Sequence, residues 1–217
     1  MRLIIGLVGV KTSGKTTVTN MIREFVKAKE VSIADKLKNT CASTFGLKRS
    51  QFDFQELKEQ PFENPFKLEM DDIKEILKDF SINMSDDELQ KRYKDVVGTI
   101  LETPRRIAQV VGTEVLRSTG DEDLHCKNVI LDKERITIVS DIRFPNEFKY
   151  FNNLEGFKFI PLYINRNVAE ANIDDHPSET SVFLFTDKCI KLDNNGKLSD
   201  TELQIKKILD KELLNAK

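Results

Sequence analysis

Eight consecutive residues near the start of the chain have the types and the spacing that bind phosphate groups. They are Gly9, Val10, Lys11, Thr12, Ser13, Gly14, Lys15 and Thr16, and they match the pattern G-x-x-x-x-G-K-[S/T] without a gap. The glycines allow the backbone to turn successive N–H groups toward an anion. In this pattern the Lys15 ammonium group reaches the β- and γ-phosphates, and the Thr16 hydroxyl ligates Mg²⁺. The loop therefore predicts a site for a nucleoside triphosphate with magnesium, and we include Thr17 in that site.

The segments on either side of this loop have the character that the motif requires. Residues 3–8 are an apolar run typical of a buried strand, and residues 17–26 carry apolar side chains at helical spacing. The alternative is a glycine turn that precedes a helix by chance. Because both a strand and a helix are predicted, the sequence favours phosphate binding.

Charged residues also follow two other predicted strands. Residues 136–140 are rich in β-branched side chains and predict a central strand that ends at Asp141, and Arg143 lies two residues further on. Arg166 follows a strand predicted at residues 158–164. A carboxylate at a strand end can hold Mg²⁺ directly or through water, and arginines can neutralise a transferred phosphoryl group. A capping aspartate and solvated or ion-paired arginines are the alternatives.

A helix that starts at Pro104 carries a third polar group. Proline is favoured in the first helical turn, and Arg105 and Arg106 follow it directly. Arg106 and Gln109 are three residues apart, so they share a helix face. An arginine can grip a monophosphate bidentately, and an amide can read the edge of a base. On pattern alone, an ordinary polar helix face is the favoured explanation of these residues.

The remaining pattern predicts an α/β fold in which strands alternate with helices. Further strands are expected at residues 31–33 and 189–192, and further helices at residues 35–45, 71–80, 86–101, 146–154 and 199–214. Such alternation indicates a parallel central sheet with helices on both faces, a three-layer arrangement.

We expect one domain, with its core at about residues 1–46 and 102–217. Residues 47–101 are rich in charge and thin in apolar content, so we interpret them as a helical insertion rather than as an independent domain. Residues 166–182 are polar and lack periodicity, which predicts a mobile loop.

Composition limits the classes of function. The chain has 217 residues and a formal net charge of −2, so no global basic field attracts it to nucleic acid or to an anionic membrane. No apolar run approaches the roughly 20 residues of a membrane span. The three widely spaced cysteines and the absence of a signal-peptide pattern favour a cytoplasmic protein. A homodimer is a common arrangement for proteins of this kind, so a homodimer is one expected state of this chain.

Several segments together resemble the bacteriophage deoxynucleoside monophosphate kinases, which have the P-loop nucleoside monophosphate kinase fold. The matching segments are Gly9–Thr16, Ala34–Lys38, Arg105–Glu114, Asp141–Glu147, His176–Glu179 and Asn194–Gly196. The phosphate loop alone is widespread. The combination of Arg-Arg-x-x-Gln-x-x-Gly-Thr-Glu with Asp-x-Arg-Phe-Pro-Asn-Glu is much more selective, whereas residues 47–101 match least.

The resemblance implies that the γ-phosphoryl group of ATP is transferred to a deoxynucleoside 5′-monophosphate, with Mg²⁺ bound to the ATP. By this resemblance Thr16 and Asp141 serve the metal, Lys15, Arg143 and Arg166 serve catalysis, and Asn195 lies near adenine. The expected acceptor-site residues are Lys38, Arg105, Arg106, Gln109, Thr113, Asp141, Arg143 and Glu179. Residues 166–182 would form a short lid. If the protein is viral, it would act in the cytoplasm of a host cell. Many related lids carry several arginines, whereas this one has only Arg166 before the acidic Asp174 and Asp175.

Three other interpretations remain open at this stage. Phosphomevalonate kinase of the animal type shares the phosphate loop and a Val-Ser-Asp-x-Arg strand end, but it lacks the Arg-Arg-x-x-Gln helix. A GTP-dependent switch would carry an Asn-Lys-x-Asp motif, which does not occur here. A DNA-binding ATPase is disfavoured by the net charge of −2. The sequence does not specify which bases are accepted or how the sugar is selected.

Overall fold

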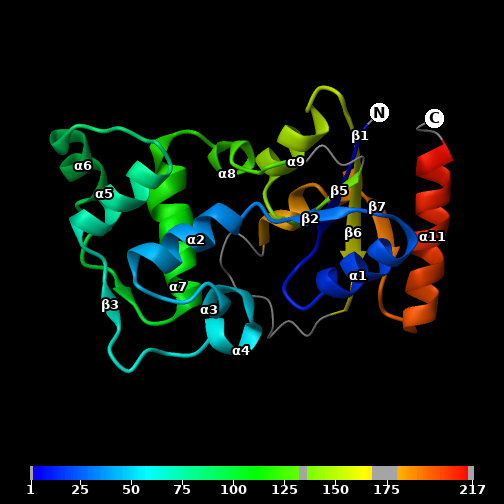
Figure 1. Cartoon of the computed structure of the whole chain (residues 1–217), viewed down its shortest axis with the longest axis horizontal. Coiled ribbons are helices and arrows are strands. Elements are labelled where there is room, and N and C mark those ends of the chain that lie inside the picture. The colour runs from blue at the N-terminus through cyan, green and yellow to red at the C-terminus, as the bar shows by residue number, and fades with distance from the viewer. Residues whose placement is uncertain (1, 132–135, 168–179, 215–217) are drawn as a thin grey trace. The chain divides into compact units, whose positions relative to one another are not determined.

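A parallel five-stranded sheet organises the first and last parts of the chain in the computed structural model. Its strands are β1 (Arg2–Val8), β2 (Lys29–Val31), β5 (Ile136–Ile142), β6 (Phe157–Asn165) and β7 (Ile190–Asp193). They lie in the order β2-β5-β1-β6-β7, and every neighbouring pair is parallel (Figure 1). The structure describes residues 2–131, 136–167 and 180–214. The expected parallel sheet is therefore confirmed.

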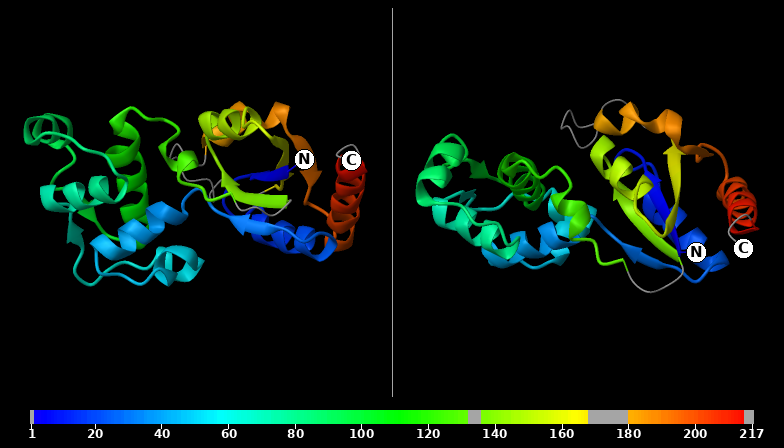
Figure 2. Two further views of the ribbon diagram at one scale, coloured as in Figure 1. Left: turned by 45° about the horizontal axis from the view of Figure 1, so that its top comes forward. Right: turned by 90° about the horizontal axis from the view of Figure 1, so that it is seen from above.

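Both faces of this sheet are covered. Alternate residues of β1, among them Leu3 and Ile5, pack in one apolar cluster with α1 (Lys15–Phe25) and α11 (Leu198–Leu214). The intervening residues, such as Ile4, belong to a second cluster with α9 (Pro145–Asn152) and the 3₁₀ turn at Ser181–Leu184, which a second 3₁₀ turn at Thr186–Lys188 follows. Side chains of a strand alternate between its two faces, so these clusters lie on opposite sides of the sheet. Figure 2 shows α1 and α11 side by side.

The described residues divide into two compact units with separate cores. The first unit is Met1–Ile33 with Cys126–Lys217, and it contains the sheet. The second unit is Ala34–His125. Its elements are α2 (Asp35–Thr44), α3 (Ser50–Asp53), α4 (Gln55–Lys58), β3 (Phe66–Lys67), α5 (Met70–Asp79), α6 (Asp86–Tyr93), β4 (Ile100–Leu101), α7 (Pro104–Gln109), a π-helical segment (Val110–Leu116) and a 3₁₀ turn (Arg117–Thr119); α8 (Leu124–Lys127) begins at its end.

The second unit extends beyond the insertion expected at residues 47–101. Buried residues of α2, such as Leu37 and Cys41, share a core with Ile73 and Ile76 of α5 and with Ile107 of α7. Helices on both sides of the expected insertion thus complete its apolar core. Residues 47–101 by themselves are thin in apolar content, because about half of the buried residues in the core of the second unit lie outside that range.

Several elements end at residues other than those expected. The strand expected at residues 31–33 is β2 at Lys29–Val31, and the helix expected at residues 86–101 ends at Tyr93. Gly98, with a φ of 91°, then turns the chain so that β4 pairs antiparallel with β3. The helix that starts at Pro104 changes to π-helical geometry at Val110. Of these differences, the pairing of β4 with β3 joins residues that lie far apart in the sequence.

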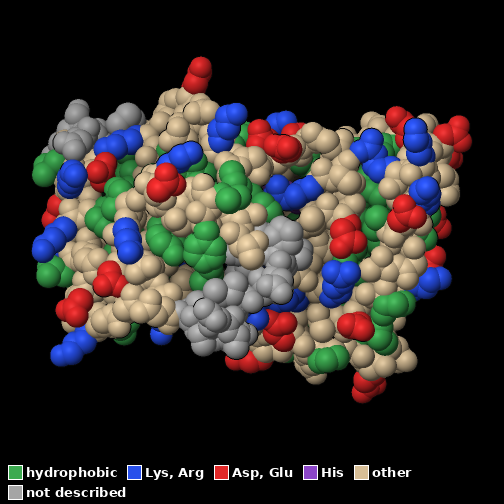
Figure 3. Space-filling model, turned by 180° about the vertical axis from the view of Figure 1, so that it is seen from behind, with side chains coloured by type: hydrophobic (Ala, Val, Ile, Leu, Met, Phe, Trp, Pro, Cys, Tyr) green, Lys and Arg blue, Asp and Glu red, His purple; other side chains and the backbone are tan. Residues whose placement is uncertain are grey.

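Lysines and arginines are interspersed with aspartates and glutamates on the face drawn in Figure 3. This mixture agrees with the formal net charge of −2. No helix among the described residues is both long enough and apolar enough to cross a membrane.

Candidate active site

The phosphate-binding motif forms the turn between β1 and α1. β1 ends at Val8, and Gly14 precedes α1 with a φ of 99° and without a side-chain cap. Thr12 also has a positive φ of 63°, which is unusual for a β-branched residue and is found where surrounding structure or function requires it. The N–H groups at a helix N-terminus without a side-chain cap can donate to an anion. The loop therefore has a backbone that suits anion binding.

The Lys15 side chain folds back over this loop. Its Nζ donates to the carbonyl oxygens of Gly9 at 2.8 Å and Val10 at 2.7 Å. The ammonium group is thus held beside the loop by the loop's own backbone. Gly9 has no room for a side chain, because an added Cβ would lie 2.6 Å from Ser13 Oγ.

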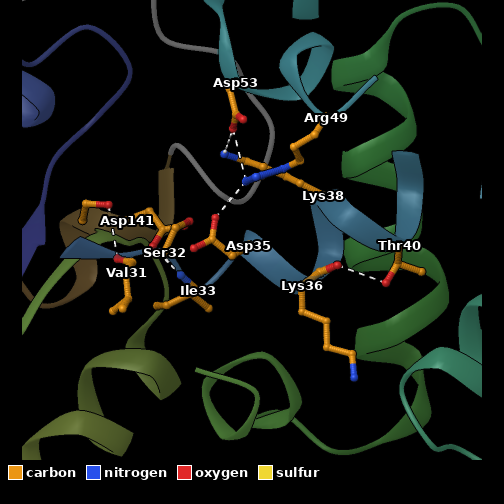
Figure 4. Close-up of polar contacts among 11 residues, drawn as sticks. Val31, Ser32, Ile33, Asp35, Lys36, Lys38, Thr40, Arg49, Asp53 and Asp141 are labelled. Atoms are coloured by element: carbon orange, nitrogen blue, oxygen red, sulfur yellow. Dashed lines mark hydrogen bonds and ion pairs between the residues drawn. The ribbon is translucent and has the colours of Figure 1, made fainter. Parts of the chain in front are cut away.

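Asp141 lies on β5, next to the end of β1. Val8 pairs with Ile142, so Asp141 lies at the end of the strands at which the phosphate loop leaves β1. One carboxylate oxygen accepts from Ser32 Oγ at 2.6 Å and the other from the Ile33 N–H at 2.7 Å (Figure 4). Beyond the end of β2 at Val31, the Ile33 N–H thus donates to a side chain of β5. A carboxylate offers about four acceptor positions, so Asp141 is a chemically suitable oxygen ligand for a metal ion or its water.

The strand end after Asp141 is stabilised by a buried carboxylate. Glu147, only 4% exposed, accepts from the Arg143 N–H at 2.8 Å and from the Phe144 N–H at 3.1 Å. This contact holds the backbone of Arg143 at the start of α9. Pro145 in the first turn followed by Glu147 is a recognisable helix-start pattern, so this role of Glu147 could have been predicted locally.

Arg166 lies on the other side of the phosphate loop. It follows β6, which pairs with β1 along the edge opposite to β5. Its guanidinium NH1 is 3.5 Å from the carbonyl oxygen of Thr12. Because β5 and β6 flank β1, the strand order brings Asp141, Arg143 and Arg166 to the same end of the sheet as the loop.

Asn195 has a role in the turn that follows β7. Its Oδ1 accepts from the Asn167 N–H at 2.6 Å, and its Nδ2 donates to the Asn165 carbonyl oxygen at 3.2 Å. The side chain expected near adenine is therefore a link between the ends of β6 and β7. Any contact with a base would involve this turn as a whole.

In the second unit, Lys38 belongs to a cluster of four charged side chains (Figure 4). Its Nζ lies 3.1 Å from Oδ1 of Asp53, and the same oxygen is 3.2 Å from the guanidinium group of Arg49. Arg49 also pairs with Asp35 at 2.8 Å. Sequence reasoning missed Arg49. Its spacing of four residues from Asp53 is a local signal, but its contact with Asp35 joins two different helices and has no local pattern.

The arginines of α7 point to different partners. Arg105, whose side chain is 18% exposed, pairs with Glu59 at 2.7 Å, whereas Arg106 lies 3.7 Å from Glu114 and is 41% exposed. Gln109 is the last residue of α7. Thr113 lies in the π-helical segment, a geometry that often occurs at functional sites.

The structure thus divides the expected site residues between the two units. Gly9–Thr17, Asp141, Arg143, Arg166 and Asn195 belong to the first unit, whereas Lys38, Arg105, Arg106, Gln109 and Thr113 belong to the second. Glu179 and most of the expected lid at residues 166–182 lie outside the described residues.

Residues 3–205 match the sequence model of a family described as deoxynucleotide monophosphate kinase. A protein of Acanthamoeba polyphaga mimivirus, provisionally named a deoxynucleotide monophosphate kinase, is 28% identical over 225 residues, which cover 96% of each chain. The deoxynucleoside-5′-monophosphate kinase of Escherichia phage T5 is 26% identical over 101 residues, which cover 43% of this chain and 40% of that protein. The solved structure of TT1252 from Thermus thermophilus covers 97% of each chain at 17% identity, with a TM-score of 0.37 that supports no conclusion.

Proposed function

Because the chain belongs to the deoxynucleotide monophosphate kinase family, we propose that it transfers the γ-phosphoryl group of ATP to a deoxynucleoside 5′-monophosphate. The products are ADP and the deoxynucleoside diphosphate. The observation that carries this proposal is the phosphate loop between β1 and α1, at the end of the sheet where Asp141 and the two arginines also lie. The family match disfavours the isoprenoid kinase and the nucleotide switch.

The first unit supplies the residues for ATP. The N–H groups of the loop would hold the phosphates, and Lys15 would move from the Gly9 and Val10 carbonyls to the β- and γ-phosphates. Mg²⁺ prefers oxygen ligands, and the Thr16 hydroxyl and Asp141 carboxylate fit that preference. When bound, the ion neutralises charge on the phosphate oxygens.

Arg143 and Arg166 would stabilise the charge on the transferred group. Phosphoryl transfer depends mainly on positioning and on neutralising negative charge, so guanidinium groups beside the loop are suited to it. The side chain of Arg166 lies beside the loop, near Thr12. We assign it the position nearer to the phosphates of ATP.

The second unit supplies residues for the acceptor nucleotide. Lys38 and Arg49 share a carboxylate oxygen of Asp53, so an incoming phosphate would compete with that carboxylate for both cations. Arg106 would contact the same nucleotide, and Gln109 could read the edge of its base. Since the named relatives are viral, we further propose that the protein acts in the cytoplasm of a host cell.

A substrate panel tests this function. Each deoxynucleoside monophosphate, each ribonucleotide counterpart and phosphomevalonate would be offered separately with Mg·ATP, and ADP release would be measured in a coupled assay. We expect turnover with one or more deoxynucleotides and none with phosphomevalonate. Lys15→Ala protein prepared in parallel controls for contaminating host kinases. Turnover of the isoprenoid alone would overturn the proposal.

A further inference from the structure

A buried asparagine outside the phosphate motif contacts the phosphate loop. Asn194 directly follows β7 and is only 8% exposed. Its Nδ2 donates to the carbonyl oxygen of Ser13 at 2.8 Å, across 181 positions of sequence. Buried polar side chains are nearly always hydrogen-bonded, and this bond provides a partner for the buried Nδ2 group of Asn194.

The contact controls the direction of an N–H group in the loop. The Ser13 carbonyl and the Gly14 N–H belong to one peptide group, and the described chain contains no cis peptide bond. In a planar trans peptide the two groups point in opposite directions. Because Asn194 holds the carbonyl on its own side, the Gly14 N–H is held on the opposite side of the peptide plane.

Gly14 is shaped to admit this asparagine. A Cβ added to Gly14 would lie 2.4 Å from Asn194 Nδ2, and the φ of 99° disfavours any side chain at this position. The second glycine of the motif therefore serves both the loop conformation and the close approach of Asn194.

The orientation of the amide is itself determined by α11. Thr201, only 1% exposed, donates from Oγ1 to Asn194 Oδ1 at 3.0 Å. The Ser13 carbonyl can only accept, so Nδ2 must face it and Oδ1 must face Thr201. If the amide were flipped, two acceptor oxygens would face each other beside Ser13.

We propose that Asn194 is a positioning residue for the triphosphate site, oriented by Thr201. It fixes the Ser13–Gly14 peptide so that the Gly14 N–H is preorganised to donate to a nucleotide phosphate. This inference rests on the proposed function only in that the loop binds a nucleotide. Through Thr201, the start of α11 supports the ATP site, although α11 carries no residue of the phosphate motif.

Binding of Mg·ADP to the full chain, measured by titration calorimetry, tests the proposal. Thr201→Val keeps the shape of the side chain but removes the hydroxyl donor, whereas Thr201→Ser keeps the donor and is the matched control. We expect Thr201→Val to weaken ADP binding about five- to tenfold, the effect of one net hydrogen bond, and Thr201→Ser to bind within about twofold of the wild type. Neither variant should change the affinity for a deoxynucleoside monophosphate.

Asn194→Asp provides an independent variant. Its carboxylate would place an acceptor against the Ser13 carbonyl, so ADP binding should weaken more than tenfold at neutral pH. Thermal unfolding by circular dichroism would define a temperature at which each variant is folded, and the Thr201 pair suffices if this variant does not fold.

Two results would overturn the proposal. One is unchanged ADP affinity in Thr201→Val, and the other is an equal loss of affinity for ADP and for the monophosphate, which would indicate general destabilisation. Wild-type protein that binds ADP but phosphorylates no deoxynucleotide would contradict the proposed function and leave the positioning role standing.

Discussion

At the scale of single residues, the backbone of the phosphate loop restrains the Lys15 ammonium group. Its contacts of 2.8 Å and 2.7 Å to the Gly9 and Val10 carbonyl oxygens hold the cation beside the loop, from which it would move to the phosphates of a bound nucleotide. A positioned cation stabilises the negative charge that develops during phosphoryl transfer, so loss of this ammonium group should slow the reaction.

We therefore expect Lys15→Ala to lower kcat by about 10²- to 10³-fold, the range for loss of a key charge-stabilising donor. Lys206→Ala, which removes an exposed lysine of α11, is the charge-matched control. Both activities would be measured at saturating ATP and acceptor, with circular dichroism to establish folding. Turnover by Lys15→Ala at the wild-type rate would show that the loop is structural.

Substitution of Arg106 tests the proposed acceptor site. Its guanidinium group is 41% exposed and lies 3.7 Å from Glu114, so it is accessible to a ligand. Arg106→Ala should raise the KM for the monophosphate by about 10- to 100-fold, as expected for the loss of a charged hydrogen bond, and should leave the KM for ATP nearly unchanged. Lys91→Ala on α6 is the control, and an equal rise in both KM values would remove Arg106 from the acceptor site.

At the scale of elements, local caps determine where helices begin. α6 starts at a capping box in which Ser85 Oγ accepts from the Glu88 N–H and the Glu88 carboxylate accepts from the Ser85 N–H. These contacts with Ser85 hold the pKa of Glu88 below its usual range. The ion pair with Lys74 likewise lowers the pKa of Asp86.

A pKa that is lower in the folded state implies a definite pH dependence. The contribution of Glu88 to stability is present above its unfolded pKa, at about 4.3, and is lost as the pH falls through its lower folded value. Glu88→Ala should therefore destabilise the protein at pH 7 more than Asp87→Ala, a substitution in the same helical turn. Urea unfolding at a series of pH values should show the difference shrinking as the pH falls below the unfolded pKa of about 4.3. A difference that stays constant as the pH falls would contradict this account.

At the scale of the whole molecule, the expected donor and acceptor residues belong to two units with separate cores. The sheet unit contains the phosphate loop, and the unit at Ala34–His125 contains Lys38 and the α7 residues. A ligand that binds a folded unit stabilises it by mass action, and local stability is visible in amide hydrogen exchange.

Hydrogen exchange with each nucleotide alone should separate the two sets of residues. Mg·ADP should slow exchange mainly in peptides that cover residues 9–16, whereas a deoxynucleoside monophosphate should slow it mainly in residues 104–114. An unrelated sugar phosphate is the control ligand. Protection by the monophosphate that is confined to the sheet unit would contradict the acceptor assignment.

Much of this architecture was predictable because it depends on short-range patterns. The parallel sheet, the phosphate loop between a strand and a helix, and the helix starts at Asp86 and Pro104 all follow from residues within a few positions of one another. The predicted end of the helix that starts at Asp86 was wrong. The helix ends at Tyr93, and the chain turns at Gly98 so that β4 pairs with β3, a partner outside the local pattern. The bounds of the second unit differed from expectation, because its core combines helices from both sides of the presumed insertion.

Local sequence is enough to place a phosphate loop between an apolar strand and an amphipathic helix, and it specifies which side chains the loop carries. What surrounds that loop depends on how the whole chain folds. The strand order places β5 and β6 beside β1. Asp141 accepts a hydrogen bond from Ser32 across 109 positions of sequence, and Asn194 donates one to Ser13 across 181 positions. Local periodicity records which face of an element is buried but not which element covers it, so contacts of this range arise only when the chain closes on itself.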